Sequence, residues 1–198
     1  MSIGSTAPVV LASQSPRRRE LLGHLCPEFE VVPADIDETP FAAEDALTYV
    51  ERLARTKAET VVRLRPAHAV IAADTTVDLD GEILGKPETA EEACEMLRRL
   101  SDRTHRVHTG VAIGHDGQLA HGVSTALVRF LPVTEREIAW YVGTGEPMDK
   151  AGAYGLQGAG GAFVEQVTGS VSAIVGLPLT LLLQLAGRVG VDLLRRQA

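Results

Sequence analysis

The 198-residue chain is poor in cysteine and has no long apolar run. Cys26 and Cys94 lie far apart and form no C-x-x-C motif, so no disulfide framework is expected and a reducing, cytoplasmic setting is favoured. No stretch of about 18 apolar residues occurs, which predicts no membrane partner. The first residues also lack the basic and apolar regions of a signal peptide.

Positive charge is scarce as well. The chain has 19 Lys and Arg against 26 Asp and Glu, a formal net charge of -7. Proteins that bind DNA or RNA present a basic surface, so this balance argues against a nucleic-acid partner but allows a small anion at a local cluster. With 45% hydrophobic residues the chain can bury its own core. We expect one domain over residues 1–198, either compact or divided into two lobes around a central cleft.

Apolar periodicity predicts an α/β fold. An apolar run at residues 69–73 is typical of a buried strand, and a helical apolar pattern covers residues 43–65. Residues 104–113 and 118–133 alternate around a His-Asp-Gly turn, as two antiparallel strands do. Because strands alternate with helices, the sequence predicts a mixed twisted sheet flanked by helices.

The stretch VVLASQSPRRRELL places three arginines at a predicted helix start. Ser15 is a natural N-cap, and Pro16 suits the first helical position. Arginines there oppose the helix dipole at a cost of roughly a few tenths of a kcal/mol, which an arriving anion would offset. The turn has no glycine and is not a P-loop. The segment alone therefore leaves a phosphate site and a solvated charged turn equally open.

Asp74 directly follows the apolar run 69–73 and precedes Thr75 and Thr76. Open α/β sheets bind ligands beyond the carboxyl ends of their strands, so we expect Asp74 at a strand end facing a ligand. There it could act as a general base for water, as a metal ligand or as both. The competing interpretation is an Asx turn closed on Thr76. The acidic run 35–38 adds carboxylates for a metal-phosphate site, although such runs are more often solvated loops.

Two lysines and a glycine-rich segment are further candidates. Lys57 lies on the apolar edge of its predicted helix, where a lysine usually extends its amino group to solvent, and Lys86 lies in a predicted loop. Together with the arginines they offer cations from three segments, as a triphosphate requires. Five glycines at positions 152–161 surround Gln157, whose amide suits the reading of a base edge. A plain turn between sheet elements is the alternative.

In combination these motifs resemble the Maf family of nucleoside triphosphate pyrophosphatases. The resemblance runs in order from Val9 to Leu185 through LASQSPRRRELL, ADTTV with GKP, SDRTHRVHTGVAI and DKAGAYGLQGAGGAFVEQVTGSVSAIVGLPL. It implies an α/β fold similar to the inosine triphosphate pyrophosphatase (Maf/Ham1-like) fold. It further implies hydrolysis of a nucleoside triphosphate to the monophosphate and pyrophosphate, a divalent metal cation (Mg²⁺, Mn²⁺ or Co²⁺) and a homodimer.

The resemblance also implies roles for single residues. Asp74 is expected to activate water, and Asp74 and Glu38 are the candidate metal ligands. The positions linked to substrate choice are Arg18, Thr75 and Gln157, a combination similar to the dTTP/UTP subgroup, with CTP or modified nucleotides as other substrates. Further pocket positions are Ser13, Glu38, Lys57 and Lys86, with Arg17 and Arg19 as supporting charge. The alternative is a nucleotide-binding regulator of cell division or septum formation with little catalytic activity.

Overall fold

The computed structural model describes residues 7–194. The strands are β1 (Val9–Leu11), β2 (Glu30–Val31), β3 (Ala69–Leu79), β4 (Glu82–Leu84), β5 (Thr104–His115), β6 (Gln118–Phe130) and β7 (Val164–Thr168). The α-helices are α1 (Pro16–Gly23), α2 (Ala46–Leu64), α3 (Ala90–Leu100), α4 (Glu135–Gly143), α5 (Val171–Val175) and α6 (Leu179–Arg188). Three short 3-10 helices are η1 (Glu146–Asp149), η2 (Ala151–Ala153) and η3 (Ala159–Phe163).

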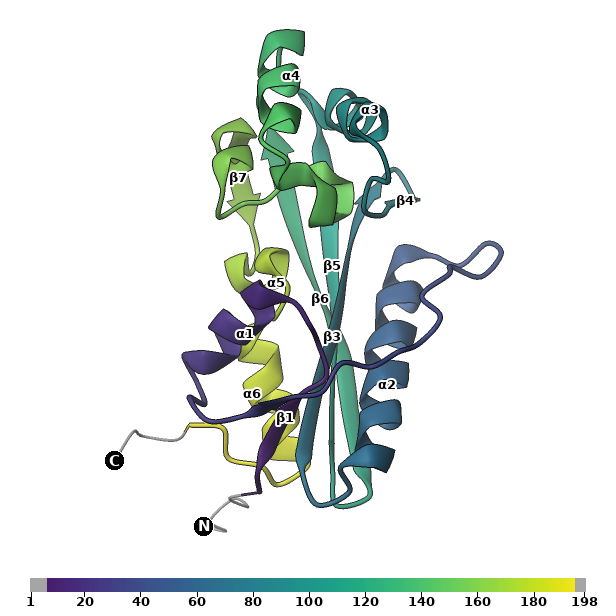
Figure 1. Ribbon diagram of the computed structural model, residues 1–198, viewed down its shortest axis with the longest axis vertical. Helices are drawn as coiled ribbons and strands as arrows, with labels where there is room; N and C mark the ends of the chain where they lie inside the picture. The colour runs from purple at the N-terminus through teal and green to yellow at the C-terminus, as the bar shows by residue number, and fades with distance from the viewer. Residues whose placement is uncertain (1–6, 195–198) are drawn as a thin grey trace.

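One seven-stranded mixed sheet runs through the described residues. Its order is β2-β1-β3-β5-β6-β7, and β4 pairs with β3 beyond the end of β1. The pairs β1–β2 and β1–β3 are parallel, and the other pairs are antiparallel. Helix α2 packs on one face of the long strands, and α5 and α6 pack on the other (Figure 1). The predicted mixed sheet flanked by helices is confirmed.

Strand β3 is buried on both faces, which explains its continuous apolar run. Successive side chains of a strand point to opposite faces. Val70 and Ala72 accordingly pack in the core cluster that includes α2, whereas Ile71 and Ala73 pack in the cluster that includes α1 and α6. The same alternation carries on into Asp74 and Thr75 and sends their side chains to different faces.

The prediction that the strand ends at Asp74 is wrong, because β3 continues to Leu79. Strand β5 pairs with β3 from Val70 to Asp78 and keeps the backbone extended. On the opposite edge, pairing with β1 ends near Ile71, and pairing with β4 begins only at Val77. We call the stretch between these two the open edge of β3. Asp74 lies at the centre of this open edge, beyond the carboxyl end of β1 rather than of its own strand.

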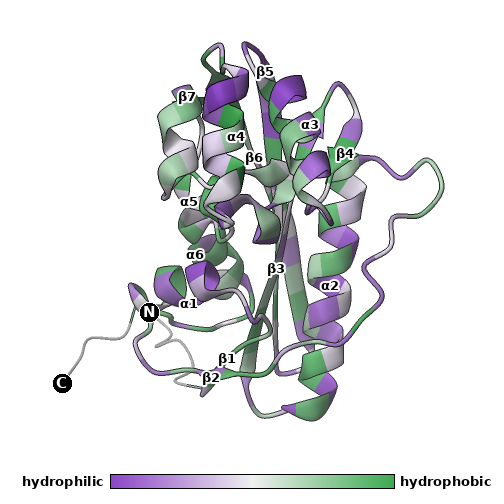
Figure 2. Cartoon of the chain, turned by 45° about the horizontal axis from the view of Figure 1, so that its top comes forward, coloured by the Kyte–Doolittle hydropathy of each residue, from purple (hydrophilic) through white to green (hydrophobic). Residues whose placement is uncertain are grey.

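Helix α2 spans Ala46–Leu64 and begins at an N-cap, Asp45, whose carboxylate accepts from the Leu47 and Thr48 amides. The predicted start at residue 43 was therefore slightly early. The helix approaches β5 closely at Gly110, where an added Cβ would lie 2.2 Å from the Val50 carbonyl oxygen. Polar and apolar residues alternate around α2 (Figure 2), and its apolar side faces the sheet. The absent side chain at position 110 thus seats α2 against the strands that carry the candidate site.

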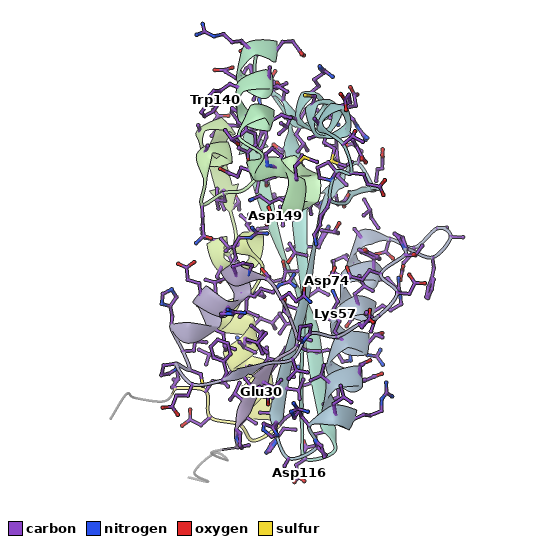
Figure 3. The ribbon with its side chains drawn as sticks, in the orientation of Figure 1. Glu30, Lys57, Asp74, Asp116, Trp140 and Asp149 are labelled. Carbon is purple, nitrogen blue, oxygen red and sulfur yellow. The ribbon has the colours of Figure 1, made fainter. Side chains whose placement is uncertain are left out.

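Five of the eight aromatic residues gather at the end of the molecule formed by α3, α4 and the 3-10 helices. Phe130 lies edge-on to Tyr154, and Tyr141 lies edge-on to Phe163, in one buried cluster. Trp140 is exposed on the outside of this end, and Asp116 in the β5–β6 turn lies at the other end of the molecule (Figure 3). The glycine-rich segment is therefore organised as short helical turns against a packed core. Within residues 7–194, no helix is both long enough and apolar enough to span a membrane.

Candidate active site

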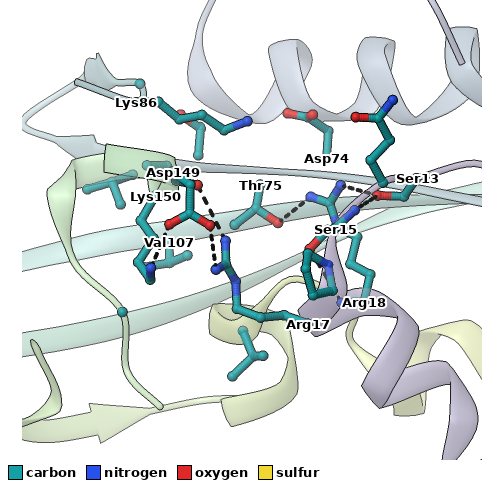
Figure 4. A pocket seen from close by; sticks show the side chains of 18 of the residues that line it. Ser13, Ser15, Arg17, Arg18, Asp74, Thr75, Lys86, Val107, Asp149 and Lys150 are labelled. Carbon is teal, nitrogen blue, oxygen red and sulfur yellow. Dashed lines mark hydrogen bonds and ion pairs between the residues drawn. The ribbon is translucent and has the colours of Figure 1, made fainter. Parts of the chain in front are cut away.

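A cavity of about 780 Å³ opens beside the open edge of β3. Its walls come from the β1–α1 turn, the loop before α2, helix α2 itself, the β4–α3 loop and the segment from η1 to residue 158. Figure 4 shows its interior. The structure brings all eight residues predicted from the sequence to this one cavity: Ser13, Arg18, Glu38, Lys57, Asp74, Thr75, Lys86 and Gln157.

Lys57 joins two carboxylates from different segments. Its Nζ donates to Asp74 Oδ1 at 2.7 Å and forms an ion pair with Glu38 Oε1, also at 2.7 Å. The Lys57 and Asp74 side chains are only 8% and 10% exposed, and they lie together at the centre of the molecule (Figure 3). Lys57 is thus buried in an ion pair, and the alternative of a solvent-directed lysine is excluded. Asp74, in mid-strand and bound to Lys57, does not form the alternative Asx turn.

This ion-pair cluster shifts the pKa values of Glu38, in the loop that precedes α2, and of Tyr49, on α2. Burial of Glu38 opposes its ionisation, but the hydrogen bond and charge of Lys57, with the charges of Lys86 and Arg18, lower the Glu38 pKa. Burial and the nearby Asp74 and Glu38 carboxylates raise the pKa of Tyr49 to about 12. Tyr49 therefore stays a neutral phenol, which donates to the Glu38 carbonyl oxygen at 3.0 Å and holds that loop on α2.

Arg18 reaches the other side of the open edge. Its Nε donates to the Gly176 carbonyl oxygen at 2.8 Å, Nη2 to Thr75 Oγ1 at 3.1 Å and Nη1 to Ser13 Oγ at 3.3 Å. Thr109 Oγ1 donates to a carbonyl oxygen, so the 2.9 Å contact between the two threonines orients the Thr75 hydroxyl to accept from Arg18. Burial lowers the pKa of Arg18, but a guanidinium stays charged. Its three partners are neutral, which leaves the positive charge available to an anion.

A second charged group crosses the cavity from α1 to η1. Arg17 Nη1 lies 3.0 Å from Asp149 Oδ2, and Lys150 Nζ lies 2.6 Å from Asp149 Oδ1 (Figure 4). Arg17 lines the cavity together with Arg18, whereas Arg19 is exposed outside it. This placement follows from the helix, because successive side chains point about 100° apart. Of the three arginines, two face the cavity.

The family model of Maf-like proteins matches residues 8–189. This chain belongs to the Maf family. Relatives named dTTP/UTP pyrophosphatase are 54% identical in Myxococcus xanthus (strain DK1622), over 93% of this chain and 94% of the relative, and 52% identical in Anaeromyxobacter dehalogenans (strain 2CP-C), over 93% and 95%. Among solved structures, the Staphylococcus aureus Ham1 protein aligns with 62% of this chain and 71% of its own at 18% identity and a TM-score of 0.47. The family resemblance seen in the motifs is confirmed.

The donor set of this Maf-family cavity fits a cation that arrives with an anionic ligand. Within residues 7–194, no three His, Cys, Asp or Glu side chains are grouped as a metal site. Glu38 and Asp74, however, both line the cavity and meet at the amino group of Lys57. Mg²⁺ is commonly bound through one or two protein carboxylates, with phosphate and water oxygens completing its shell. Glu38 and Asp74 can supply these two carboxylates.

Sequence reasoning missed several residues that line the Maf cavity. Tyr49, Glu146 and Asp149 were not predicted as site residues, although all three line it. Glu146 stands between Gly145 and Pro147 in a segment without apolar periodicity, so no pattern distinguishes it from a surface acid. Tyr49 could have been found from Lys57, because residues eight apart lie on the same face of a helix.

Proposed function

We propose that this Maf-family chain is a nucleoside triphosphate pyrophosphatase that converts dTTP and UTP to the monophosphate and pyrophosphate. The names of its relatives support this assignment. The observation that carries it is the ion-pair cluster in which Lys57 holds Asp74 and Glu38, placed beside a guanidinium with neutral partners.

The cations facing the cavity suit a triphosphate. Arg18 contacts neutral acceptors, and Lys86, which extends into the cavity in Figure 4, contacts no carboxylate in the described part of the chain. Phosphate oxygens would complete the bonding of both groups through charge-assisted hydrogen bonds. In hydrolysis at the α-phosphorus, these two cations would stabilise the charge that develops on the leaving pyrophosphate.

Asp74 is the proposed general base. Lys57 binds its Oδ1, which fixes the direction of the carboxylate. The carboxylate would then orient the attacking water and accept its proton. Thr75, Arg18 and Gln157 are proposed to select the nucleotide, with the Gln157 amide directed at the base edge.

A divalent cation among Mg²⁺, Mn²⁺ and Co²⁺ is proposed to bind Glu38 and Asp74. When bound, it would supply electrophilic neutralisation of the phosphate charge. The role of Lys57 is then to hold the two carboxylates side by side before the nucleotide enters.

The proposed setting is the cytoplasm. The proposed form is a homodimer in which each chain is a single domain over residues 1–198, with one lobe on each side of the cavity. Light scattering of the purified chain measures the assembly directly.

The deciding experiment incubates the chain with each nucleoside triphosphate and Mg²⁺ or Mn²⁺ and identifies the first phosphate product. Pyrophosphate from dTTP and UTP, lost in Asp74→Asn while nucleotide binding persists, supports the proposal. Tight binding without pyrophosphate release would instead favour the nucleotide-binding regulator of cell division. Orthophosphate as first product would identify a phosphatase that removes the terminal group.

A further inference from the structure

The backbone of the glycine-rich segment is held by one carboxylate. Glu146 Oε2 accepts from the Ala159 amide at 2.9 Å, and Oε1 accepts from the Gly160 amide at 3.4 Å. Tyr141, which is fully buried, donates its hydroxyl to Glu146 Oε1 at 2.8 Å and accepts the Gly155 amide at 3.1 Å. Tyr141 and Glu146 are bonded to each other and therefore hold backbone amides on both sides of Gln157.

Gln157 itself has no such support. Its side chain is exposed at the cavity wall and makes no hydrogen bond within residues 7–194. Its place is consequently set by the backbone that carries it, from Gly155 to Gly160. That backbone is short of side-chain packing, because three of its six residues are glycine.

Gly158 leaves room for the Glu146 carboxylate because it has no side chain. Its φ of -108° is negative, so a left-handed backbone does not explain this glycine. An added Cβ, however, would lie 2.2 Å from Glu146 Oε1 and 2.5 Å from Oε2. Position 158 and Glu146 are thus a matched pair in which one residue lacks a side chain where the other places its carboxylate.

The anchor is an anion. Burial opposes ionisation of Glu146, but hydrogen bonds from Ala159, Tyr141 and Gly160, with the charge of Lys150, lower its pKa. Lys150 also donates to the Glu146 carbonyl oxygen at 2.6 Å and lies over Gly155, where a Cβ would be 2.5 Å from its Cε. The η1 turn therefore contacts the segment at Gly155 through Lys150 and at residues 158–160 through Glu146.

We propose that Glu146 is the positioning residue of nucleotide selection: through Tyr141 and the amides of residues 159 and 160, it orders residues 155–160 and aims Gln157 into the cavity. The selection half of this inference rests on the proposed function, whereas the ordering half does not. Glu146 makes no direct contact with the proposed reacting groups Asp74 and Lys57, so its loss acts on binding and choice of nucleotide more than on turnover.

The test is a double-mutant cycle of Glu146→Ala and Gly158→Ala, with the exposed β7 residue Glu165→Gln as the charge-loss control. Hydrogen exchange comes first and needs no nucleotide. Glu146→Ala should speed amide exchange at Ala159 and Gly160 by about tenfold or more, since these two amides lose their acceptor, while Glu165→Gln leaves it unchanged. Gly158→Ala alone should do the same by displacing the carboxylate. In the Glu146→Ala background it should add less than about twofold, because the clash is gone.

The second readout is kinetic. Glu146→Ala should raise KM for dTTP and UTP by about tenfold and lower the preference over purine triphosphates, with kcat changed less than about threefold. Glu146→Gln, which keeps one acceptor oxygen for Tyr141, should recover part of both effects.

Unchanged exchange in Glu146→Ala, or Gly158→Ala effects that are fully additive, would overturn the anchoring role. Altered exchange with unaltered selectivity would overturn the role in selection. If the unmodified chain releases no pyrophosphate, the proposed function fails while the exchange result still decides the anchoring role.

Discussion

Asp74 and Thr75 are neighbours in β3, yet they bind partners on opposite faces of the sheet. Asp74 accepts from Lys57 of α2, and Thr75 accepts from Arg18 of α1. Strand alternation produces this division, and the missing neighbour strand at the open edge lets both faces meet one cavity. A ligand at this edge is therefore reached by a carboxylate from one face and by a guanidinium from the other.

The Lys57–Asp74 pair is expected to separate stability from activity. Lys57→Met keeps the length of the side chain but leaves Asp74 buried without its cation, which should lower the free energy of unfolding by about 3–5 kcal/mol. Adding Asp74→Asn removes the unpaired charge and should restore most of that stability without restoring pyrophosphate release. Urea unfolding and a pyrophosphate assay measure the two effects. Additive losses of stability in the double variant would contradict the pairing.

The Thr75 hydroxyl is expected to matter as an acceptor for Arg18. Thr75→Val keeps the shape of the side chain but leaves Arg18 Nη2 without its 3.1 Å partner. A hydrogen bond to a charged group contributes about 1.5–3 kcal/mol, so kcat/KM should fall about tenfold to a hundredfold. Thr75→Ser, which retains the hydroxyl, is the matched control and should stay within about threefold of the unmodified chain. A loss in Thr75→Ser that exceeds the loss in Thr75→Val would mean that the methyl group, rather than the hydroxyl, is what the site needs.

Buried His105 predicts a loss of stability in acid. Burial lowers its pKa from 6.5 to about 4, so the folded protein binds this proton less readily than the unfolded chain does. Above pH 6.5 the His105 ring is neutral in both states and costs the fold nothing. As the pH drops from 6.5 through 4, the unfolded chain takes up the proton first, and the free energy of unfolding falls by about 3 kcal/mol. The structural cause is a ring whose Nε2 lies 2.8 Å from the Tyr154 hydroxyl and whose Nδ1 has no partner in the described residues.

The matched variant is His105→Gln, which can keep a hydrogen bond to Tyr154 but does not titrate. Unfolding free energies at pH 7, 5.5 and 4 should decline less steeply in this variant than in the unmodified chain. Equal pH dependence of the two proteins would assign the acid sensitivity to other groups.

Much of the candidate site was predictable because local chemistry marked it. Ser15 and Pro16 announce a helix start, and the arginines behind them are unfavourable there without an anion. Asp74 interrupts an apolar strand at a position where no core residue would be polar. Lys57 was the harder case, since its helical position was compatible with either a solvated or a buried amino group. The decision lay in Asp74 and Glu38, which are distant in the sequence.

The sequence by itself determined the mixed α/β fold, the helix caps, the tight turns and the family, because periodicity and short motifs are properties of neighbouring residues. Only the tertiary structure decided where β3 ends, since pairing with β5 overrides the local break after the apolar run. It alone also brought the Glu146 carboxylate against Gly158. Their relationship is a shared volume between segments, and no local pattern records the space that a missing side chain leaves for a distant carboxylate.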